Sequence, residues 1–313
     1  MPDTTHLTED DVRLVLDPRR LIAAIEAAFR DRFPFVTIPE RTVIQLGHGI
    51  FLSMSCYDPA TNTLGMKVVT VRDRDQLAPG EGGVHATYFL LDPQTSLPRL
   101  TIAANYLTDL RTAATSAVAT KFLARPDASS LGIFGTGRLA HSHLRVLPLV
   151  RDFQRVLICG RSPTRSAELV KQLSAEMPGI TIAAADARTC VAESDVLCTC
   201  TSSSIPLFDG RDLRAGTHLN LVGSFQSHTR EADTRTIQHA RVIVDAHKSA
   251  ESEPGELSIA RKENAIAADH IVADLHELVS GKKQGRRGAE NITAFKSVGC
   301  ALEDLVAAEL LGQ

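Results

Sequence analysis

The first third of the chain changes from a helical spacing of apolar residues to a strict alternation of apolar and polar ones. Asp17 and Pro18 have the character of a helix N-cap and first turn. The apolar residues that follow recur on one helix face: Leu21, Ile22, Ile25, Ala28 and Phe29. Four short alternating runs come next, broken by Gly, Pro and Asp: residues 41–46, 50–57, 64–71 and 86–92. Such alternation predicts strands of an antiparallel sheet.

Further along, apolar runs alternate with helical or polar segments. Residues 107–124 predict a helix with small side chains on one side. Strands are then expected near residues 131–135, 155–160, 181–184, 195–201, 218–224 and 241–245. This alternation is typical of a parallel, doubly wound sheet. Residues 292–310 predict a strand running into an amphipathic helix, and the polar segment 280–291 is expected to be a solvated loop.

A glycine-rich turn at the start of this second region carries the clearest chemical signal. The run LGIFGTGRLAHSHL, residues 131–144, is an apolar strand, a turn and the start of a helix. Gly135, Gly137 and Ala140 fit the G-x-G-x-x-G/A pattern of a dinucleotide-binding βαβ unit. Phosphates would bind at the helix N-terminus, where unpaired N–H groups and the helix dipole favour negative charge.

The end of the next predicted strand bears on the choice between NADP(H) and NAD(H). An NAD site usually places Asp or Glu there, on the ribose 2′-hydroxyl. This chain instead has Gly160, Arg161 and Ser162, with Arg165 one turn later. Because guanidinium groups bind phosphates well, the pattern favours NADP(H) over NAD(H). The alternative is two solvated arginines at the start of a surface helix.

Composition narrows the functional class. The 313 residues are 43% hydrophobic and 23% charged, as in an ordinary globular protein, and suffice for two domains. A net charge of −3 argues against nucleic acid or an anionic membrane as the main partner. No apolar stretch approaches the ~18 residues of a membrane span, and the acidic, polar N-terminus is unlike a signal peptide. A cytoplasmic location is therefore expected.

The cysteines and histidines show no metal-binding pattern. The six cysteines lack a C-x-x-C or zinc spacing, and most lie in apolar runs, as buried free thiols do. His141 and His143, two residues apart on a predicted helix, cannot share a helix face. No metal is predicted, and a catalytic cysteine is not favoured.

Three cations stand in unusual surroundings. Arg41, Lys67 and Arg111 lie in short apolar strands or near a helix start, where an unpaired charge is expensive. A guanidinium can hold a carboxylate through two hydrogen bonds. Lys67, in a desolvated pocket near other cations, would have a lowered pKa and could exchange a proton with an imine nitrogen. The alternative is that each cation forms a structural salt bridge.

Several motifs together resemble a known family. They are PERT (39–42), GMKVVTV (65–71), NYLTDLRTAATSAVATKFLA (105–124), FGTGRLAHSH (134–143), DVLCTCTSS (195–203), VGSF (222–225), EPGEL (253–257) and FKSVGCALEDL (295–305). On these motifs the chain resembles the ornithine cyclodeaminase and mu-crystallin family over nearly its whole length. The resemblance implies an α/β protein: a Rossmann doubly wound parallel sheet domain, residues 119–295, is inserted in an α+β substrate-binding and dimerisation domain, residues 1–118 plus 296–313. It also implies a homodimer formed through the sheet of the latter domain.

The resemblance implies roles for individual residues. Lys67 and Arg111, and more loosely Arg41, correspond to the family's substrate-binding basic residues. Gly135 belongs to the turn that holds the cofactor. The implied cofactor contacts are Gly137, Arg138 and Leu139 at the pyrophosphate, Arg161, Ser162 and Arg165 at the adenosine phosphate, Cys200 and Thr201 after the fourth strand, Val222 and Ser224 near the nicotinamide, and Ser297 and Val298 over its ring.

One position departs from the deaminases of this family. They carry an Asp in a G-A-D-x-P-G-K-x-E-L-D stretch, whereas here Gly223, Glu231 and Asp233 fix a register that puts Phe225 in its place. Cyclodeamination needs a carboxylate for the amine and proton transfers, and a phenyl ring cannot perform them. His228 is the alternative base, or else a solvated loop residue. The Gly-Ser-Phe version resembles the family's imine reductases.

The leading hypothesis is therefore NADPH-dependent reduction of a cyclic α-imino acid, Δ1-pyrroline-2-carboxylate or Δ1-piperideine-2-carboxylate, to the L-amino acid by hydride transfer. Lys67 and Arg111 are the predicted catalytic residues: Lys67 or a bound water supplies or holds the imine proton, and Arg111 with Arg41 fixes the carboxylate. The alternatives are an NAD-dependent ornithine cyclodeaminase, an alanine-dehydrogenase-like enzyme, and a non-catalytic crystallin-like binding protein.

Overall fold

The computed structural model describes residues 4–73, 76–78, 82–95, 97–250 and 254–312. The chain divides into two compact units: a first unit of Met1–Thr112 with Cys300–Gln313, and a second unit of Ala113–Gly299. The division therefore lies six residues before the boundary predicted at 118/119 and four residues after the one predicted at 295/296. Glu253, the first residue of the EPGEL motif, lies outside the described residues.

The first unit contains a six-stranded sheet with the order β1-β6-β5-β4-β3-β2. Its strands are β1 (Thr5–Leu7), β2 (Thr42–Leu46), β3 (Gly49–Asp58), β4 (Thr63–Arg72), β5 (Val84–Leu91) and β6 (Pro98–Ala103). Strands β2 to β6 pair in antiparallel fashion, which confirms the predicted antiparallel sheet, and β1 adds a short parallel strand beside β6. Sequence alternation did not predict β1 or β6.

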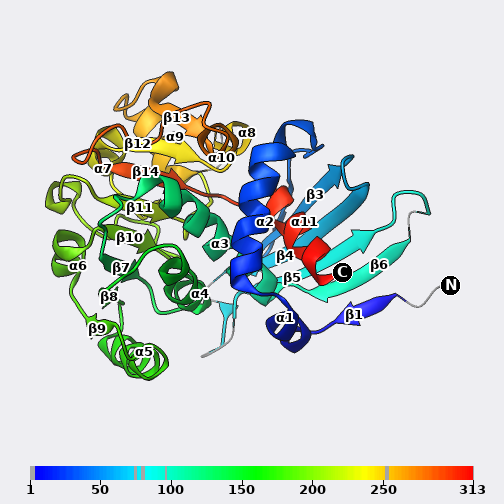
Figure 1. Cartoon of the computed structure of the whole chain (residues 1–313), viewed down its shortest axis with the longest axis horizontal. Helices are drawn as coiled ribbons and strands as arrows, with labels where there is room; N and C mark the ends of the chain where they lie inside the picture. Colours follow the sequence, from blue (N-terminus) through cyan, green and yellow to red (C-terminus); the bar gives the residue numbers. More distant parts are fainter. Residues whose placement is uncertain (1–3, 74–75, 79–81, 96, 251–253, 313) are drawn as a thin grey trace. The chain divides into compact units, whose positions relative to one another are not determined.

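Helices cover one face of this sheet. They are α1 (Glu9–Val15), α2 (Pro18–Asp31) and α11 (Ala301–Leu311), and a short 3-10 turn, η1 (Phe33–Phe35), follows α2. The Asp17 side chain accepts a hydrogen bond from the Arg20 backbone N–H, with Pro18 in the first turn, so the predicted N-cap is confirmed. The predicted apolar face of α2 is buried. Figure 1 shows α11 beside α2, and α11 also packs on β3, β4 and β5.

The prediction of an amphipathic final helix was wrong. Every residue of α11 from Ala301 to Ala308 is buried, including Glu303 and Asp304. Two charges at buried positions made the helix resemble one with a solvated side. Their burial requires charged partners, which are described with the candidate site.

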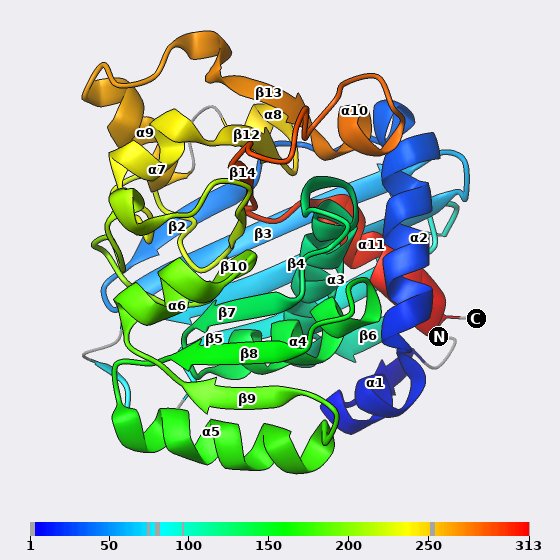
Figure 2. The same cartoon turned by 60° about the vertical axis from the view of Figure 1, so that its left-hand side comes forward.

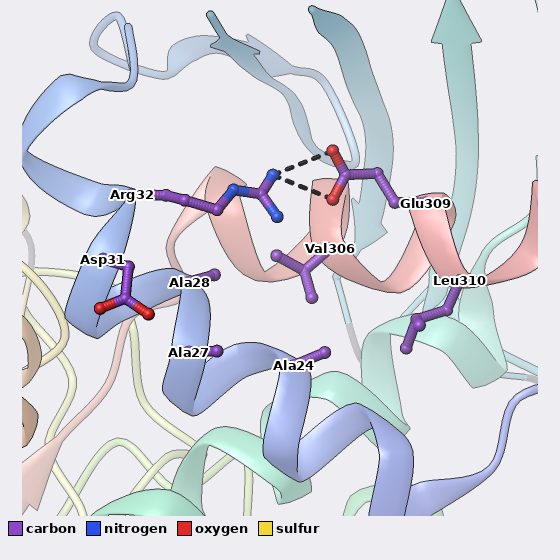
Figure 3. Close-up of a pocket in the computed structure, with 8 residues that line it drawn as sticks. All are labelled: Ala24, Ala27, Ala28, Asp31, Arg32, Val306, Glu309 and Leu310. Carbon is purple, nitrogen blue, oxygen red and sulfur yellow. Dashed lines mark hydrogen bonds and ion pairs between the residues drawn. The ribbon is translucent and has the colours of Figure 1, made fainter. Parts of the chain in front are cut away.

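A hollow of about 220 Å³ lies between α2 and α11 (Figure 3). Its lining residues are Ala24, Ala27, Ala28, Asp31, Arg32, Val306, Glu309 and Leu310. At one end the Arg32 guanidinium donates to both carboxylate oxygens of Glu309 at 2.9 Å, and it also contacts the buried Asp58. No predicted site residue lines this hollow.

The second unit is built on an eight-stranded parallel sheet with the order β13-β12-β14-β11-β10-β7-β8-β9. Its strands are β7 (Ser130–Phe134), β8 (Arg155–Cys159), β9 (Thr181–Ala184), β10 (Val196–Thr199), β11 (His218–Leu221), β12 (Arg241–Val244), β13 (Ile271–Asp274) and β14 (Thr293–Lys296). The predicted doubly wound parallel sheet is thus confirmed, with β13 as a strand that the sequence pattern did not reveal. From β7 the chain adds β8 and β9 on one side and then crosses to add β10 on the other side of β7. The topological switch point therefore lies between β7 and β10, the place where open α/β sheets bind ligands.

Helices connect these strands, and Figure 2 shows α5 alongside β9 and β8. The long helix α3 (Asn105–Leu123) begins in the first unit and continues into the second. The other helices are α4 (Arg138–Val146), α5 (Pro163–Glu176), α6 (Ala187–Glu193), α7 (Thr234–His239), α8 (His247–Ala250), α9 (Gly255–Lys262) and α10 (Leu275–Val279), with the 3-10 turns η3 (Leu147–Leu149), η4 (Gly210–Asp212) and η5 (Ala268–His270). Within the described ranges, no helix combines the length and the apolar character needed to cross a membrane.

The segment 280–291 is a loop, but part of it is anchored in the interior rather than solvated. Gly285 is buried, and the partly buried Arg286 donates to the backbone oxygens of Leu123 at 2.6 Å and Gly216 at 2.9 Å. The same guanidinium also donates to the Asn291 oxygen at 2.5 Å. Arg286 therefore fastens the loop to the unit, whereas the other basic residues of the segment, Lys282, Lys283 and Arg287, are exposed.

Candidate active site

A buried cluster of charges in the first unit joins two of the predicted cations. Lys67 lies on β4 at a position that faces the helices and is 1% exposed, and Arg111 lies on α3 and is 5% exposed. The Lys67 Nζ and the Arg111 Nε each lie 2.8 Å from Asp304 Oδ1. Arg111 also donates to Glu303. Two cations and two carboxylates thus compensate one another in the interior, as buried charges require.

The two carboxylates of this cluster were not predicted from the sequence. Glu303 and Asp304 are both fully buried at the start of α11, and the Glu303 side chain also accepts a hydrogen bond from the Cys300 backbone N–H. The capping interaction and the packing of α11 fix both carboxylates in place. The only signal in the sequence was the Glu-Asp pair near the end of the FKSVGCALEDL motif. This pair also lies in the first turn of a helix, where negative charge is favourable.

The pKa of Lys67 is lowered by its surroundings. Burial and the positive charge of Arg111 lower the pKa of Lys67 to about 8, while Asp304 acts in the opposite direction. A lysine with this pKa exchanges protons near neutral pH, which is the property a general acid or base needs. The predicted lowering of this pKa is confirmed in direction.

Among the described residues, several buried polar atoms of the same unit have no hydrogen-bond partner, and the Asp304 Oδ2 and the Tyr88 hydroxyl are two of them. Tyr88 faces Lys67 in the register of β4 and β5, and its ring lies over Gly65, where a side-chain carbon would come within 1.9 Å of the hydroxyl oxygen. Unsatisfied buried polar atoms are uncommon and indicate a place for a ligand or an ordered water.

Arg41 differs from the other two predicted substrate contacts. It lies directly before β2, and its side chain is partly exposed. Lys67 and Arg111 are instead buried and share Asp304. The substrate-binding roles of all three residues remain predictions.

The glycine turn of the second unit has the geometry expected of a dinucleotide cradle. Gly135 follows β7 with a φ of +114°, and a side-chain carbon there would lie 2.6 Å from the Cys200 carbonyl oxygen. Gly137 is the N-cap of α4, makes no side-chain cap, and has open space where a side chain would stand. Ala140 is buried against the sheet, whereas Arg138 is exposed and Leu139 partly exposed. The first amides of α4 are thus available to a phosphate, so the turn fits a dinucleotide.

The end of β8 has no room for the acidic residue of an NAD site at position 160. A side-chain carbon on Gly160 would lie 2.5 Å from Ser166 Oγ and 2.7 Å from Thr136 Cγ2. Ser162 caps α5 by accepting a hydrogen bond from the Arg165 backbone N–H. Arg161 and Arg165 are exposed. A cavity of about 290 Å³ lies nearby, lined by Thr136, His141, Arg165, Glu168, Leu169 and Gln172.

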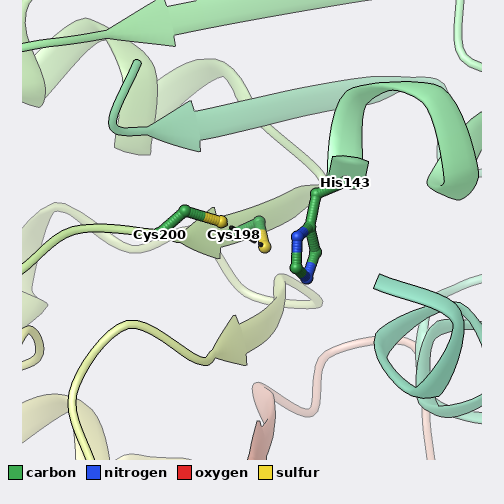
Figure 4. Close-up of side chains that lie close together, drawn as sticks. All are labelled: His143, Cys198 and Cys200. Atoms are coloured by element: carbon green, nitrogen blue, oxygen red, sulfur yellow. Dashed lines mark hydrogen bonds between the residues drawn. The ribbon is translucent and has the colours of Figure 1, made fainter. Parts of the chain in front are cut away.

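The thiol of Cys200 lies in the interior of the second unit (Figure 4). Its Sγ is 3.5 Å from the Cys198 Sγ, and the His143 ring lies close by. Both ring nitrogens of His143 already have partners, the Leu139 oxygen at 2.8 Å and the Ser116 Oγ at 3.0 Å. We therefore interpret this cluster as an internal hydrogen-bond network. All six cysteines are free, and all but Cys159 are buried, as predicted.

The remaining predicted cofactor residues lie just beyond the ends of three neighbouring strands. Thr201 follows β10, Val222 and Ser224 follow β11, and Ser297 with Val298 follows β14. The Ser224 hydroxyl donates to the Thr229 oxygen, so this side chain is engaged within its own loop.

The turn after β14 is held by a carboxylate. Asp245 Oδ2 accepts hydrogen bonds from the Ser297 hydroxyl at 3.1 Å and from the Val298 and Gly299 backbone N–H groups at 2.8 Å and 2.7 Å. The fold thus gathers these predicted residues at one edge of the sheet, and their contacts with a cofactor remain predictions.

Comparison with known proteins places the chain among oxidoreductases. The model of the ornithine cyclodeaminase/mu-crystallin family matches residues 3–312. A Δ1-pyrroline-2-carboxylate reductase of Colwellia psychrerythraea is 32% identical over 309 residues, with 96% of each chain covered. The structure of the Thermococcus litoralis Δ1-pyrroline-2-carboxylate reductase with NADH and L-proline superposes with a TM-score of 0.95 at 32% identity, covering 99% of this chain and 96% of that one. An archaeal alanine dehydrogenase dimer with bound NAD has a TM-score of 0.91 at 28% identity, covering 99% and 95%.

Proposed function

The chain belongs to the ornithine cyclodeaminase/mu-crystallin family, and from this premise we propose that it reduces a cyclic α-imino acid to the L-amino acid with NADPH. It is an oxidoreductase that acts on carbon–nitrogen bonds. The proposed substrates are Δ1-pyrroline-2-carboxylate and Δ1-piperideine-2-carboxylate. The observation that carries the proposal is the buried pair of Lys67 and Arg111, held by Asp304.

These residues supply what the reduction of an imine requires. When bound, a reduced nicotinamide supplies the hydride that adds to the imine carbon. Arg111 binds the substrate carboxylate, since Glu303 and Asp304 hold its guanidinium in a fixed plane. Lys67, with a pKa of about 8, holds the proton at the imine nitrogen, and the carbon–nitrogen double bond becomes a single bond with one hydride and one proton added.

The preference for NADPH rests on the end of β8. Gly160 leaves no space for the carboxylate that would bind a ribose 2′-hydroxyl. Arg161 and Arg165 are exposed beside the N-terminus of α5, which itself favours an anion. We infer that these groups bind the 2′-phosphate.

Phe225 supports reduction rather than deamination. It lies in the loop after β11, partly exposed, at the place where the deaminases of the family carry an Asp. His228, the alternative base in this loop, is exposed to solvent three residues further along the chain. The alternative functions are an ornithine cyclodeaminase, an alanine dehydrogenase or a binding protein without turnover. The first assay must distinguish these from the proposed imine reductase.

We also propose that the chain forms a homodimer through the face of the six-stranded sheet opposite α2 and α11. Along β3 and β4, residues buried under the helices alternate with partly exposed ones that include Phe51, Met66 and Val68. At the edge of the same sheet, Val43 and Ile44 are 50% and 49% exposed. Apolar surface of this kind favours association, and sedimentation of the purified protein at two concentrations tests it.

The function is tested by mixing the purified protein with NADPH and freshly prepared Δ1-pyrroline-2-carboxylate and following the absorbance of NADPH. Parallel reactions contain Δ1-piperideine-2-carboxylate, NADH in place of NADPH, or ornithine. Loss of NADPH with formation of L-proline, and no ammonia from ornithine, is the expected result. Ammonia from ornithine without net change of the cofactor would instead establish a cyclodeaminase, and tight NADPH binding without turnover would establish a binding protein.

A further inference from the structure

Glu231 is a buried carboxylate to which the proposed reaction assigns no role. It lies in the loop between β11 and α7 and is fully buried. In the sequence, Glu231 served only to fix the register that places Phe225. A buried carboxylate without a cation directly beside it requires many hydrogen-bond donors, and the structure supplies five.

These donors come from the end of β10, the loop that follows it and the loop after β11. Glu231 Oε1 accepts from the Thr201 backbone N–H and from the Thr201 hydroxyl, both at 2.7 Å. Glu231 Oε2 accepts from the Thr199 hydroxyl at 2.7 Å and from the backbone N–H groups of Gly223 at 2.8 Å and Ser224 at 3.2 Å. One carboxylate therefore ties the loop after β10 to the loop after β11.

Glu231 is itself held from behind by a second buried ion pair. Its backbone N–H donates to Glu256 Oε1 at 3.0 Å, and Glu256 Oε2 lies 3.1 Å from Lys296 Nζ. Lys296 in turn donates to the Ser224 backbone oxygen. Glu256 belongs to the EPGEL motif and Lys296 to the FKSVG motif, so this arrangement also accounts for two motif residues that the proposed mechanism leaves unused.

The place of these contacts in the fold gives them a functional meaning. Strands β10 and β11 are parallel neighbours, and their carboxyl ends are the edge at which open α/β sheets bind ligands. A side chain on Gly223 would come within 2.2 Å of the Thr201 oxygen and 2.6 Å of Glu231 Oε1, so the two loops and the carboxylate fit together only with glycine there. The loops that Glu231 joins contain Thr201 and Ser224, which are predicted cofactor contacts.

We propose that Glu231 is a positioning residue for the nicotinamide end of the cofactor: by holding the backbone of Thr201 and of Gly223–Ser224, it sets the surface on which the reactive ring lies. The proposal rests on the proposed function, because it requires a nicotinamide cofactor at this edge of the sheet. In this role Glu231 orients the hydride donor through the two loops, and Glu231 itself touches neither substrate nor cofactor.

Glu231→Gln is the sharpest test, because the amide cannot satisfy all the donors. The NH2 group of the glutamine must take the place of one carboxylate oxygen, and a backbone N–H cannot accept a hydrogen bond from it. In the place of Oε2 the NH2 group would face two backbone N–H groups, those of Gly223 and Ser224. In the place of Oε1 it would face one, that of Thr201. The amide therefore faces Thr201, whose hydroxyl can turn to accept, and the Thr201 backbone N–H loses its acceptor. The variant therefore loosens the loop after β10 selectively, while the backbone N–H groups of Gly223 and Ser224 keep their acceptor.

Asp195→Asn is the matched control. Asp195 precedes β10 at the opposite end of the same strand, and it accepts from the backbone N–H groups of Ser129 and Ser130, both at 3.0 Å. It also forms a 2.8 Å ion pair with Arg125. Replacing it destabilises the unit through a comparable loss of buried hydrogen bonds, but far from the carboxyl ends of the strands.

Four quantities distinguish a positioning role from a purely structural one. They are the Kd for NADPH from the fluorescence of the bound cofactor, kcat and KM for the imino acid, and the isotope effect on kcat with NADPH deuterated at the transferred position. For Glu231→Gln we expect the Kd to rise about tenfold, the equivalent of one unsatisfied buried donor, with a fall in kcat, a larger isotope effect and an unchanged KM for the imino acid. Asp195→Asn should lower the melting temperature and leave these values at those of the parent.

A second variant guards against failure of Glu231→Gln to fold. Thr199→Val removes one hydroxyl donor to the carboxylate in a side chain of the same shape, and we expect about a threefold rise in the same Kd. Unchanged Kd and isotope effect in both variants, in a parent protein that binds and oxidises NADPH, would refute the positioning role and leave the proposed function standing. A parent protein that binds neither NADPH nor NADH would overturn the proposed function and the positioning role together.

Discussion

Replacing Asp304 by Asn should move the pH at which the enzyme loses activity. In the proposed mechanism the protonated form of Lys67 holds the imine proton, so activity should fall as the pH rises through the pKa of Lys67. Asp304 lies 2.8 Å from the Lys67 Nζ and raises this pKa, against the lowering effects of burial and Arg111. In Asp304→Asn the pKa of Lys67 should therefore fall below its value of about 8, and the loss of activity should begin at lower pH.

The size of the effect follows from the geometry. Opposite charges about 4 Å apart attract by about 4 kcal/mol at an effective dielectric constant of about 20, which corresponds to about 3 pKa units. Arg111 shares the same carboxylate oxygen and Glu303 remains in the cluster, so part of this attraction is redistributed. We expect the pKa of Lys67 to fall by at least about 1, to below about 7.

The assay is the pH profile of kcat/KM for Δ1-pyrroline-2-carboxylate. Dividing the profile of Asp304→Asn by that of the parent protein cancels the ionisation of the substrate, which is the same in both. The ratio should be constant at low pH and fall steeply between the two pKa values. Lys67→Arg serves as the control, because a guanidinium stays protonated over the whole pH range. The kcat/KM profile of this variant should therefore lack the loss of activity caused by deprotonation of Lys67. A ratio that does not change with pH, in a variant that remains folded, would refute the assignment of the titration to Lys67.

Further predictions concern the cofactor, the reaction and the fold. Replacing Arg161 and Arg165 together by Ala should raise the KM for NADPH at least about tenfold and leave that for NADH nearly unchanged, as two lost charge-assisted hydrogen bonds require; equal changes for both cofactors would count against a 2′-phosphate site. Phe225→Asp should slow imine reduction and introduce release of ammonia from ornithine, measured directly as ammonia, and its complete absence would show that one carboxylate is insufficient. Arg286→Ala should lower the free energy of unfolding in urea by about 2 kcal/mol through loss of its carbonyl contacts, whereas its exposed neighbour Arg287→Ala should change it by less than about 0.5 kcal/mol.

Local patterns predicted most of the scaffold. The alternation along β2 to β5, the N-cap at Asp17 and the turn at Gly135 are each determined by residues within a few positions of one another. Strand β1 has only three residues and pairs with β6, which is distant in sequence, and β13 has only four, so neither has a periodicity long enough to recognise. The character of α11 was misjudged because its charged residues are buried by partners elsewhere in the chain.

The candidate site shows the same division between local and distant information. Lys67 and Arg111 stood out because cations are rare in apolar segments, yet nothing near them in sequence identifies Asp304 as their shared partner. Glu231 could be aligned with a motif, but the five donors to its carboxylate lie at the carboxyl ends of β10 and β11, which only the parallel sheet brings together. Nothing in the sequence distinguished Arg286 from the other basic residues of segment 280–291, which are exposed.

The first unit is assembled from two segments that are separated in sequence by the whole second unit, and this has a consequence for biosynthesis. Lys67 and Arg111 leave the ribosome long before α11, which brings the carboxylates of Glu303 and Asp304. A nascent chain cannot bury two cations without their counter-charges, because an uncompensated buried charge is strongly unfavourable. The second unit, continuous in sequence, can fold while synthesis proceeds. The charge cluster is therefore completed only when α11 has been synthesised and has docked, so the proposed active site cannot form on a nascent chain that still lacks α11.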